Sequence, residues 1–228
     1  MKKKPFELTK IGSLWPRFNH RVFSKHYHKK EAKRLNNTDF SLICSNCIAG
    51  VFYNFYHLKF LSPTINTDFN GLGFLKFANN IQSSLTYDLV EKKTSKLSYP
   101  VGYLNGLGPI IFPHCDSFEE AKKEWDRRKI RINYDNIIII WNAYRIVSEE
   151  QIRLFDSLPY KKVCYTIDPS LENHQNCVFL NRYKNLPSIP LLLSVRNLSG
   201  VELFEYYFDL IAYINGEEFD KCLRHKGK

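Results

Sequence analysis

The sequence predicts an α/β fold with a mostly parallel, Rossmann-like sheet flanked by helices, and a basic helical arm at the N-terminus. Three observations carry this prediction. Short apolar runs alternate with amphipathic stretches at helical spacing, which is typical of βαβ units. Residues 137–140 are four isoleucines, as in a parallel strand that is buried on both faces. Before them, Ser117 and Glu120 stand at the spacing of a capping box, which marks the start of a helix.

The first half of the chain contains the remaining elements of one α/β unit. Ser62-Pro63 ends an amphipathic helix. Asn105-Gly106 is a tight-turn signal between two apolar stretches, so we expect a pair of strands joined by a turn. The expected elements, in chain order, are a strand at 39–44, helices at 48–59 and 74–89, and strands at 99–103 and 109–113.

The second half repeats the helix–strand pattern. Ser148 and Gln151 form another capping box, which starts a short helix that Pro159 ends. Asn215-Gly216 closes the last helix, as a C-terminal cap would. The expected elements after the isoleucine strand are this short helix, strands at 162–167, 177–180 and 191–195, and a helix at 201–214 that Ser199 caps.

Composition divides the chain into three parts. Residues 1–37 form a basic amphipathic arm, residues 38–216 an α/β domain, and residues 217–228 a loose polar tail. The α/β domain is either one unit or two closely packed α/β halves, because a chain of 228 residues can bury a substantial core in both ways. Six cysteines are too few for a disulfide scaffold, and no secretory signal is recognisable, so we expect a cytoplasmic protein with reduced thiols.

The net charge of +10 is concentrated in the arm. Residues 1–35 contain eleven Lys or Arg and two acidic residues. Because the charge is confined to one segment, a nucleic-acid groove across the surface is not expected. Apolar residues between Ile11 and Phe23 have near-helical spacing, which suits a basic helix lying on an anionic membrane surface. Alternatively, this apolar face packs on the body of the protein. No apolar run reaches the roughly 18 residues of a membrane-spanning helix.

Candidate binding residues follow two of the predicted strands. Ser45, Asn46 and Cys47 lie after the first strand and open a helix, and Asn142 and Arg145 follow the isoleucine strand. Ligands of open α/β sheets bind at the carboxyl ends of strands, and a helix N-terminus attracts phosphate. The alternative is that Ser45 and Asn46 only cap the helix. Neither G-x-G-x-x-G nor a P-loop is present, so an ordinary dinucleotide site is not supported.

Two further pairs of residues have chemistry to offer. His114 and Asp116 lie between a predicted strand and the capped helix, where they provide a general base and an orienting acid. The alternative is that Asp116 serves the helix start, where acids are favoured by the helix dipole. Arg127 and Arg128 are suited to holding a diphosphate through bidentate contacts. Their alternative role is in a charged, solvated helix face.

No metal site is predicted. Cys44 and Cys47 form a C-x-x-C pair, but a structural zinc site needs four ligands and no second pair stands at a matching spacing. A redox role for the pair is the weaker reading, because free cysteines are commonly buried core residues. The sequence also contains no D-x-D, the metal–nucleotide-sugar motif of one glycosyltransferase class, and no G-x-S-x-G nucleophile elbow. We therefore expect no metal ion and no other cofactor.

The pattern E-E-A-x-x-x-W-x-R-R-x-x-R-I-N-x-D-N over residues 119–136 is specific enough to suggest a family. Together with residues 40–47, 62–64, 99–102 and 155–161, it resembles a bacterial family of unknown function, domain of unknown function 1919. Its members are often labelled exopolysaccharide biosynthesis proteins. The family commonly has Asn-Asn-Cys where this chain has Ser45-Asn46-Cys47. The resemblance implies a role in capsule or exopolysaccharide synthesis, and some relatives resemble galactofuranosyltransferases.

Our first functional hypothesis is a metal-independent glycosyltransferase. It takes a sugar, galactofuranose for example, from a nucleotide-sugar and passes it to a lipid-linked oligosaccharide at the inner face of the bacterial plasma membrane. Asn46, Cys47, Arg127 and Arg128 would hold the donor, and His114 or Asp116 would act as base. Two alternatives remain: an O-acyltransferase that acts on the same polysaccharide, and a non-catalytic assembly component of the same pathway.

Overall fold

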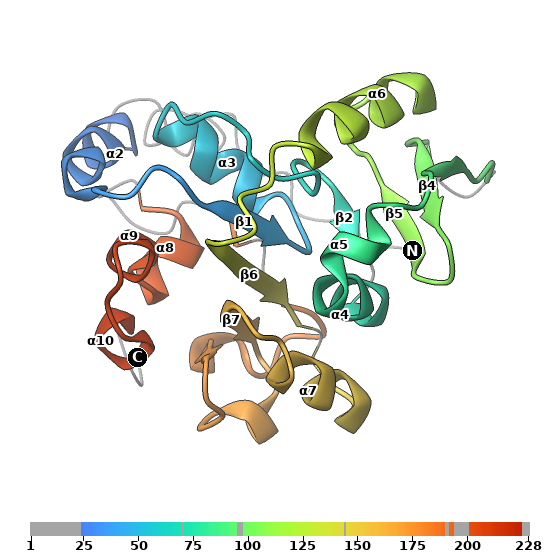
Figure 1. Cartoon of the computed structure of the whole chain (residues 1–228). Helices are drawn as coiled ribbons and strands as arrows, with labels where there is room; N and C mark the ends of the chain where they lie inside the picture. The colour runs from blue at the N-terminus through green and yellow to red at the C-terminus, as the bar shows by residue number, and fades with distance from the viewer. Residues whose placement is uncertain are drawn as a thin grey trace, which may run out of the picture.

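The centre of the molecule is a four-stranded parallel sheet with the strand order β1–β6–β7–β8 (Figure 1). The structure is a computed structural model that describes residues 24–69, 71–94, 98–143, 145–189, 192–193 and 201–224. Helices cover both faces of the sheet, so the predicted α/β class with a parallel, Rossmann-like sheet is confirmed. The strands are β1 (Ser41–Cys44), β6 (Ile137–Asn142), β7 (Lys161–Thr166) and β8 (Cys177–Phe179).

The isoleucine strand β6 lies between β1 and β7 and divides two hydrophobic cores. Side chains alternate along a strand, so Ile138 and Ile140 belong to one core, and Ile137 and Ile139 to the other. Both faces are buried, as four consecutive isoleucines predict.

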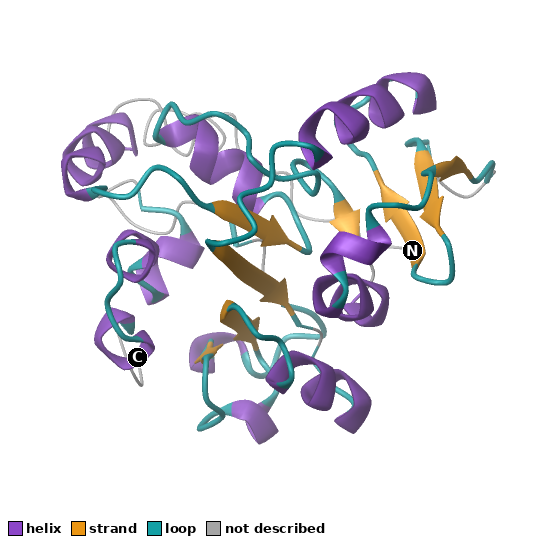
Figure 2. Ribbon diagram, in the orientation of Figure 1, coloured by secondary structure: helices purple, strands orange, loops and turns teal. Residues whose placement is uncertain are grey.

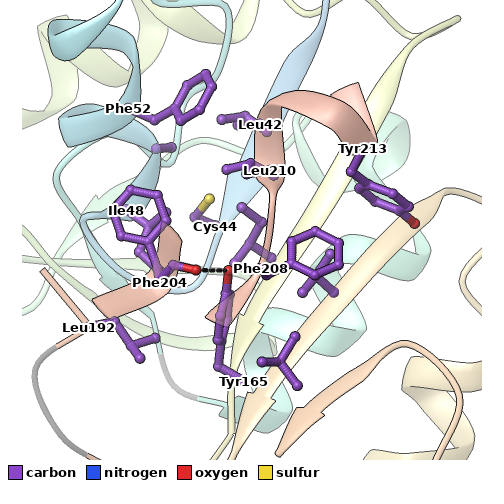
Figure 3. Close-up of a cluster of buried hydrophobic side chains, with 14 of the residues drawn as sticks. Leu42, Cys44, Ile48, Phe52, Tyr165, Leu192, Phe204, Phe208, Leu210 and Tyr213 are labelled. Carbon is purple, nitrogen blue, oxygen red and sulfur yellow. Dashed lines mark hydrogen bonds between the residues drawn. The ribbon is translucent and has the colours of Figure 1, made fainter. Parts of the chain in front are cut away.

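Different helices complete each core. The first core contains side chains from α3 (Ile48–Phe55), α8 (Leu203–Tyr207) and α9 (Leu210–Ile214). Figure 3 shows part of it, where the Tyr165 hydroxyl donates to the Phe204 carbonyl over 3.0 Å. The second core is completed by α4, α6 and α7, whose bounds are Gly71–Asn79, Phe118–Lys129 and Glu149–Asp156.

A second, antiparallel sheet is inserted between β1 and β6 (Figure 2). Its order is β2–β5–β4–β3, and β4 and β5 form the hairpin expected around Asn105-Gly106, where Gly106 has a φ of +71°. The sequence does not reveal β2 or β3, because strands of two residues have no alternating pattern. The bounds are β2 (Asp68–Phe69), β3 (Val90–Glu91), β4 (Val101–Leu104) and β5 (Gly108–Ile111).

Helix α6 starts as its capping signal predicts, with one difference. The Ser117 hydroxyl accepts from the Glu120 amide over 3.2 Å. The Glu120 carboxylate, however, accepts from the Asp116 amide over 2.9 Å, one residue before the amide that a capping box would use. Ala121 and Trp125 are buried against the second core. The second predicted capping box, at Ser148, is complete.

Three predicted elements differ in the structure. The helix expected at 74–89 is two helices, α4 and α5 (Ile81–Ser84), because Asn80 leaves the helical region with a φ of −138°. The helix expected at 201–214 is broken at Phe208, whose extended backbone pairs with Leu223 and places its ring in the core. Leu192 and Leu193 form a turn where a strand was expected at 191–195; the rest of that segment and Ser199 lie outside the described residues.

The two ends of the described chain pack together. Helix α2 (Lys25–Glu31) lies beside α8, and Arg224 bonds to Asp209. The expected amphipathic helix between Ile11 and Phe23 lies outside the described residues. The tail predicted to be loose forms α10 (Phe219–Cys222), because Phe219 contacts the first core and Cys222 is buried in it. Within the described residues, no helix has the length and apolar character needed to cross a membrane.

Candidate functional site

Two of the predicted strand-end positions meet in the structure. Cys47 follows β1 and begins α3, whereas His114 lies in the turn after β5 of the inserted sheet. The Cys47 Sγ lies 3.7 Å from His114 Nε2 and 4.0 Å from the Thr67 carbonyl oxygen. The carboxyl end of β1 therefore faces the inserted part of the chain, and His114 is brought to it.

A small cavity, the α6 cavity, opens beside His114. Its volume is about 120 Å³, which is more than one water needs and well below the roughly 300–1,000 Å³ of pockets for drug-sized ligands. It fits a phosphate-sized group and not a whole nucleotide-sugar. The lining comes from the loop after α3, the turn after β5, and one face of α6: Pro63, Ile65, Asn66, Phe112, His114, Cys115, Glu120, Glu124, Trp125 and Arg128.

Two residues of α6 that line the cavity, Trp125 and Arg128, each carry a buried N–H without a hydrogen-bond partner among the described residues. These groups are Trp125 Nε1 and Arg128 Nε. Arg128 is held by its other nitrogens: Nη1 donates to the Ile65 carbonyl over 3.4 Å and Nη2 pairs with Glu124. Its guanidinium also lies 5.2 Å from the centre of the Phe60 ring. Burial lowers the pKa of Arg128, but an arginine remains charged at neutral pH.

Arg127 and Arg128 differ in position. Both bond to Glu124, and these bonds, with Arg127 as the largest cause, lower the pKa of the Glu124 carboxyl. Arg128, however, lines the α6 cavity, whereas Arg127 is exposed on the outer face of the helix and is absent from the lining. Of the two predicted diphosphate-binding arginines, only Arg128 is placed beside the cavity.

Asn66 reaches the cavity because α3 has a glycine beneath it. Asn66 has a φ of +58°, and a Cβ built on Gly50 would lie 1.9 Å from Asn66 Oδ1. Only a residue without a Cβ lets the amide lie this close to the helix.

Replacement of Gly50 by alanine is expected to push Asn66 out of place and lower the free energy of unfolding by about 1–3 kcal/mol, the usual cost of overpacking. Denaturant unfolding measures the change. The double variant Gly50→Ala/Asn66→Gly removes the clashing amide and tolerates the positive φ, so it should recover most of the loss. If the double variant lost as much unfolding free energy as the two single variants together, Asn66 would not be the obstacle.

At the edge of the sheet, Ser45 and Asn46 make local hydrogen bonds. The Ser45 hydroxyl accepts from the Asn142 amide over 2.9 Å, and Asn46 Oδ1 accepts from the Ile48 amide over 3.1 Å. Asn142 Oδ1 is buried and has no hydrogen-bond partner among the described residues. Arg145 is exposed, and neither Asn142 nor Arg145 lines the α6 cavity. Asp116 is exposed and also lies outside the lining.

Cys47 is a neutral thiol at physiological pH. Burial, with a smaller effect from Asp68, raises the pKa of Cys47 to about 11. A thiol must lose its proton to act as a nucleophile. The contact with His114 is therefore a contact with a protonated sulphur.

Alkylation of Cys47 by iodoacetamide should reflect this raised pKa. Because the thiolate fraction grows about tenfold per pH unit below the pKa, the rate should keep rising until about pH 11. Peptide mass spectrometry after timed labelling reports Cys47 separately from the other cysteines. A rate that levels off near pH 7 would mean that His114 activates the thiol instead.

A larger cavity, the β8 cavity, lies along the edge strand of the main sheet. Its volume is about 480 Å³, and Cys177, His174 and Arg224 are among its lining residues. The Cys177 Sγ lies 3.6 Å from His174 Nδ1, and His174 Nε2 lies 3.4 Å from an Asp156 oxygen. A hydrogen bond from Cys164 and the neighbouring His174 lower the pKa of Cys177. The sequence does not reveal this group, since Asp156 at the end of α7 is far in sequence from His174 and Cys177.

The sequence analysis also missed Asn66, Glu120 and Trp125 as lining residues of the α6 cavity. Glu120 and Trp125 had visible signals, but their spacing indicated a helix cap and a buried helix face. Both roles are present in the structure, and the cavity lies against them. Asn66 had no signal, because the loop that carries it is irregular.

Comparison with known proteins gives a family and a relative. The family model described as "Domain of unknown function (DUF1919)" matches residues 18–215. A protein from Haemophilus influenzae, described as an uncharacterized protein, is 37% identical over 184 residues. The match covers 80% of this chain and 87% of that protein.

Proposed function

This chain belongs to the DUF1919 family, and we propose that it is a glycosyltransferase of capsule, exopolysaccharide or lipopolysaccharide synthesis. It would transfer a sugar, galactofuranose for example, from a nucleotide-sugar to a lipid-linked glycan. The observation that carries the proposal is that Trp125 and Arg128, which line the α6 cavity, each carry a buried side-chain N–H with no hydrogen-bond partner among the described residues. Such donors suit the charge that develops on a departing nucleoside diphosphate.

The α6 cavity would hold one phosphate of the donor. Its volume of about 120 Å³ matches that group, and the half-buried Arg128 supplies a positive charge in a site partly closed to water. Glu124 shares the charge of Arg128 and Arg127, which fixes the guanidinium but reduces its net attraction. The rest of the donor would extend along the sheet edge toward Asn46 and Asn142.

His114 is the proposed base. It lines the same cavity and is exposed, so an acceptor hydroxyl can reach it. Asp116 is a weaker candidate, because its backbone amide is held by Glu120 and its side chain lies outside the lining. No D-x-D is available, so the proposed reaction uses N–H donors in place of a metal ion. Sugar transfer should therefore persist in EDTA. The metal-ion content of the EDTA-treated protein is measured in the same samples.

The acceptor carries a lipid, which gives the basic residues of 1–35 a role. They would attract the protein to the anionic inner face of the bacterial plasma membrane, where the acceptor lies.

A second candidate function rests on the β8 cavity. Cys177, His174 and Asp156 have the order of contacts that activates a thiol, and the lowered pKa of Cys177 favours the thiolate. An O-acyltransferase would use it as follows: the Cys177 thiolate attacks the acyl carbonyl of a thioester donor, the thioester C–S bond breaks, and protonated His174 gives its proton to the departing donor thiolate. A sugar hydroxyl then attacks the acyl-cysteine, and His174 takes its proton.

One experiment separates these functions. The full-length protein is incubated with a lipid-linked acceptor and either UDP-galactofuranose or acetyl-CoA, and mass spectrometry identifies the group added to the acceptor. The proposal expects the mass of one hexose residue from the first donor and no change with the second. Addition of an acetyl group would favour the β8 cavity. No addition with any of a panel of nucleotide-sugars would favour a non-catalytic assembly role.

A further inference from the structure

A histidine and two glutamates form a closed group at the far end of α3 from the α6 cavity. His28 comes from α2, whereas Glu202 and Glu205 come from the start of α8 (Figure 1). The His28 Nε2 lies 2.9 Å from Glu205 Oε2 and 3.1 Å from Glu202 Oε2, and all three atoms lie within 4.8 Å of one another. The exposed fractions are 4%, 0% and 3% for His28, Glu202 and Glu205, so water does not solvate their charges.

The other polar atoms of this His28–Glu202–Glu205 cluster are already bonded. Ser24 Oγ lies 3.1 Å from His28 Nδ1 and donates to Glu202 Oε1 over 3.1 Å. The Tyr56 hydroxyl donates to Glu205 Oε1 over 2.7 Å. Because a hydroxyl that donates to Glu202 is free to accept, Ser24 can accept from Nδ1–H, and Nε2 becomes a ligand when an ion replaces its proton. The atoms that remain are His28 Nε2, Glu202 Oε2 and Glu205 Oε2, and they lie close to one another.

Among the described residues, no lysine or arginine forms an ion pair with the side chain of Glu202 or Glu205. The two nearby arginines, Arg34 and Arg224, are paired with Glu31 and Asp209. In the part of the chain that the structure describes, His28 is therefore the one ion-pair partner of the Glu202 and Glu205 carboxylates. Buried carboxylates without a balancing charge are costly, since burial removes their hydration.

One oxygen of the cluster has no hydrogen bond at all. Glu202 Oε2 is buried and receives no N–H or O–H from the described residues, although His28 Nε2 lies near it. A single Nε2 proton can satisfy Glu205 or Glu202, but not both with good geometry. This oxygen lies 3.1 Å from His28 Nε2 and belongs to the group of three ligand atoms that lie within 4.8 Å of one another.

We propose that His28 Nε2, Glu202 Oε2 and Glu205 Oε2 bind a divalent transition-metal ion, such as Zn²⁺ or Mn²⁺, that fastens α2 to α8. Nitrogen and oxygen ligands about 2.1 Å from one ion are separated by about 3.0 Å in octahedral geometry, which suits Mn²⁺, and by about 3.4 Å in the tetrahedral geometry usual for Zn²⁺. The observed separations of 2.9 and 3.1 Å agree with the octahedral value. The bonds from Ser24 and Tyr56 orient the ligands, as outer partners of metal sites commonly do.

This metal site is separate from the proposed transferase site. Cys47 begins α3 and Tyr56 ends it, so about nine residues at 1.5 Å each, or about 13 Å, lie between the two sites along the helix. The sequence predicts no metal ion here, because His28 lies more than 170 positions before the two glutamates and the three residues form no recognisable motif.

The test uses the full-length protein, freed of metal with a chelator and then incubated with ZnCl₂ or MnCl₂. Plasma mass spectrometry after gel filtration should find one ion per chain, and the ion should raise the unfolding temperature. Glu202→Gln keeps the shape of the side chain and should weaken ion binding at least 100-fold or so. Glu31→Gln removes a neighbouring buried carboxylate that supplies no ligand atom, so its effect should stay below about tenfold.

Two results would overturn the proposal. One is a wild-type protein that retains no ion and unfolds at the same temperature with and without metal. The other is a Glu202→Gln variant that binds as well as wild type. Should that variant fail to fold, X-ray absorption of the wild-type protein decides: nitrogen and oxygen ligands support the cluster, whereas sulphur ligands would place the ion on cysteines instead.

Discussion

Arg128→Lys should lower kcat/KM for sugar transfer by about 10²–10³-fold, the usual cost of losing one donor to a developing negative charge. Lysine keeps the positive charge but cannot supply an N–H at the position of Arg128 Nε, which is buried beside the α6 cavity and has no partner among the described residues. Steady-state rates with the nucleotide-sugar donor measure the effect.

Arg127→Lys is the matched control for this prediction. Arg127 is the next residue on the same helix and bonds to the same Glu124, but it is exposed and lies outside the cavity lining. Its replacement should change kcat/KM by no more than about threefold, as for other exposed ion pairs. Equal losses in both variants would mean that the arginines act through Glu124 or the stability of α6, and not through the donor phosphate.

His114→Asn should lower kcat by about 10²–10⁴-fold with little change in KM for the donor, because the loss falls on proton removal from the acceptor. Asn preserves some hydrogen bonding but takes up no proton. Rates at saturating donor and acceptor report this effect directly.

Two further variants serve as comparisons for the His114 prediction. His57→Asn replaces an exposed histidine at the opposite end of α3, where asparagine tolerates the φ of +53°, and it should leave kcat unchanged. Asp116→Asn should have a smaller effect than His114→Asn. If Asp116→Asn were the more damaging of the two, Asp116 would be the base.

The parallel sheet could be predicted from the sequence because its signals are local. Four isoleucines on one strand and two capping signals at Ser117 and Ser148 each depend on a few consecutive residues. The breaks at Asn80 and Phe208 could not be predicted in the same way, because apolar periodicity continues across them. In each case the tertiary packing of the neighbouring helices decides where the helix stops.

The sites depended on contacts between distant segments, so they were only partly predictable. The strand-end rule identified Cys47 and the position of His114, but not their contact, which the inserted antiparallel sheet creates. The sequence placed Arg127 and Arg128 at consecutive positions of one helix. It did not indicate which of them faces the loop at Ile65. The His28–Glu202–Glu205 cluster joins the two ends of the described chain, which local patterns cannot anticipate.

A crystal structure of the full-length protein with an intact nucleotide-sugar donor tests the central claim most directly. We expect a donor phosphate in the α6 cavity, within hydrogen-bonding distance of Trp125 Nε1 and Arg128 Nε, with the sugar on the side of His114. A donor bound along β8 beside His174 and Cys177, with the α6 cavity left to solvent, would contradict it.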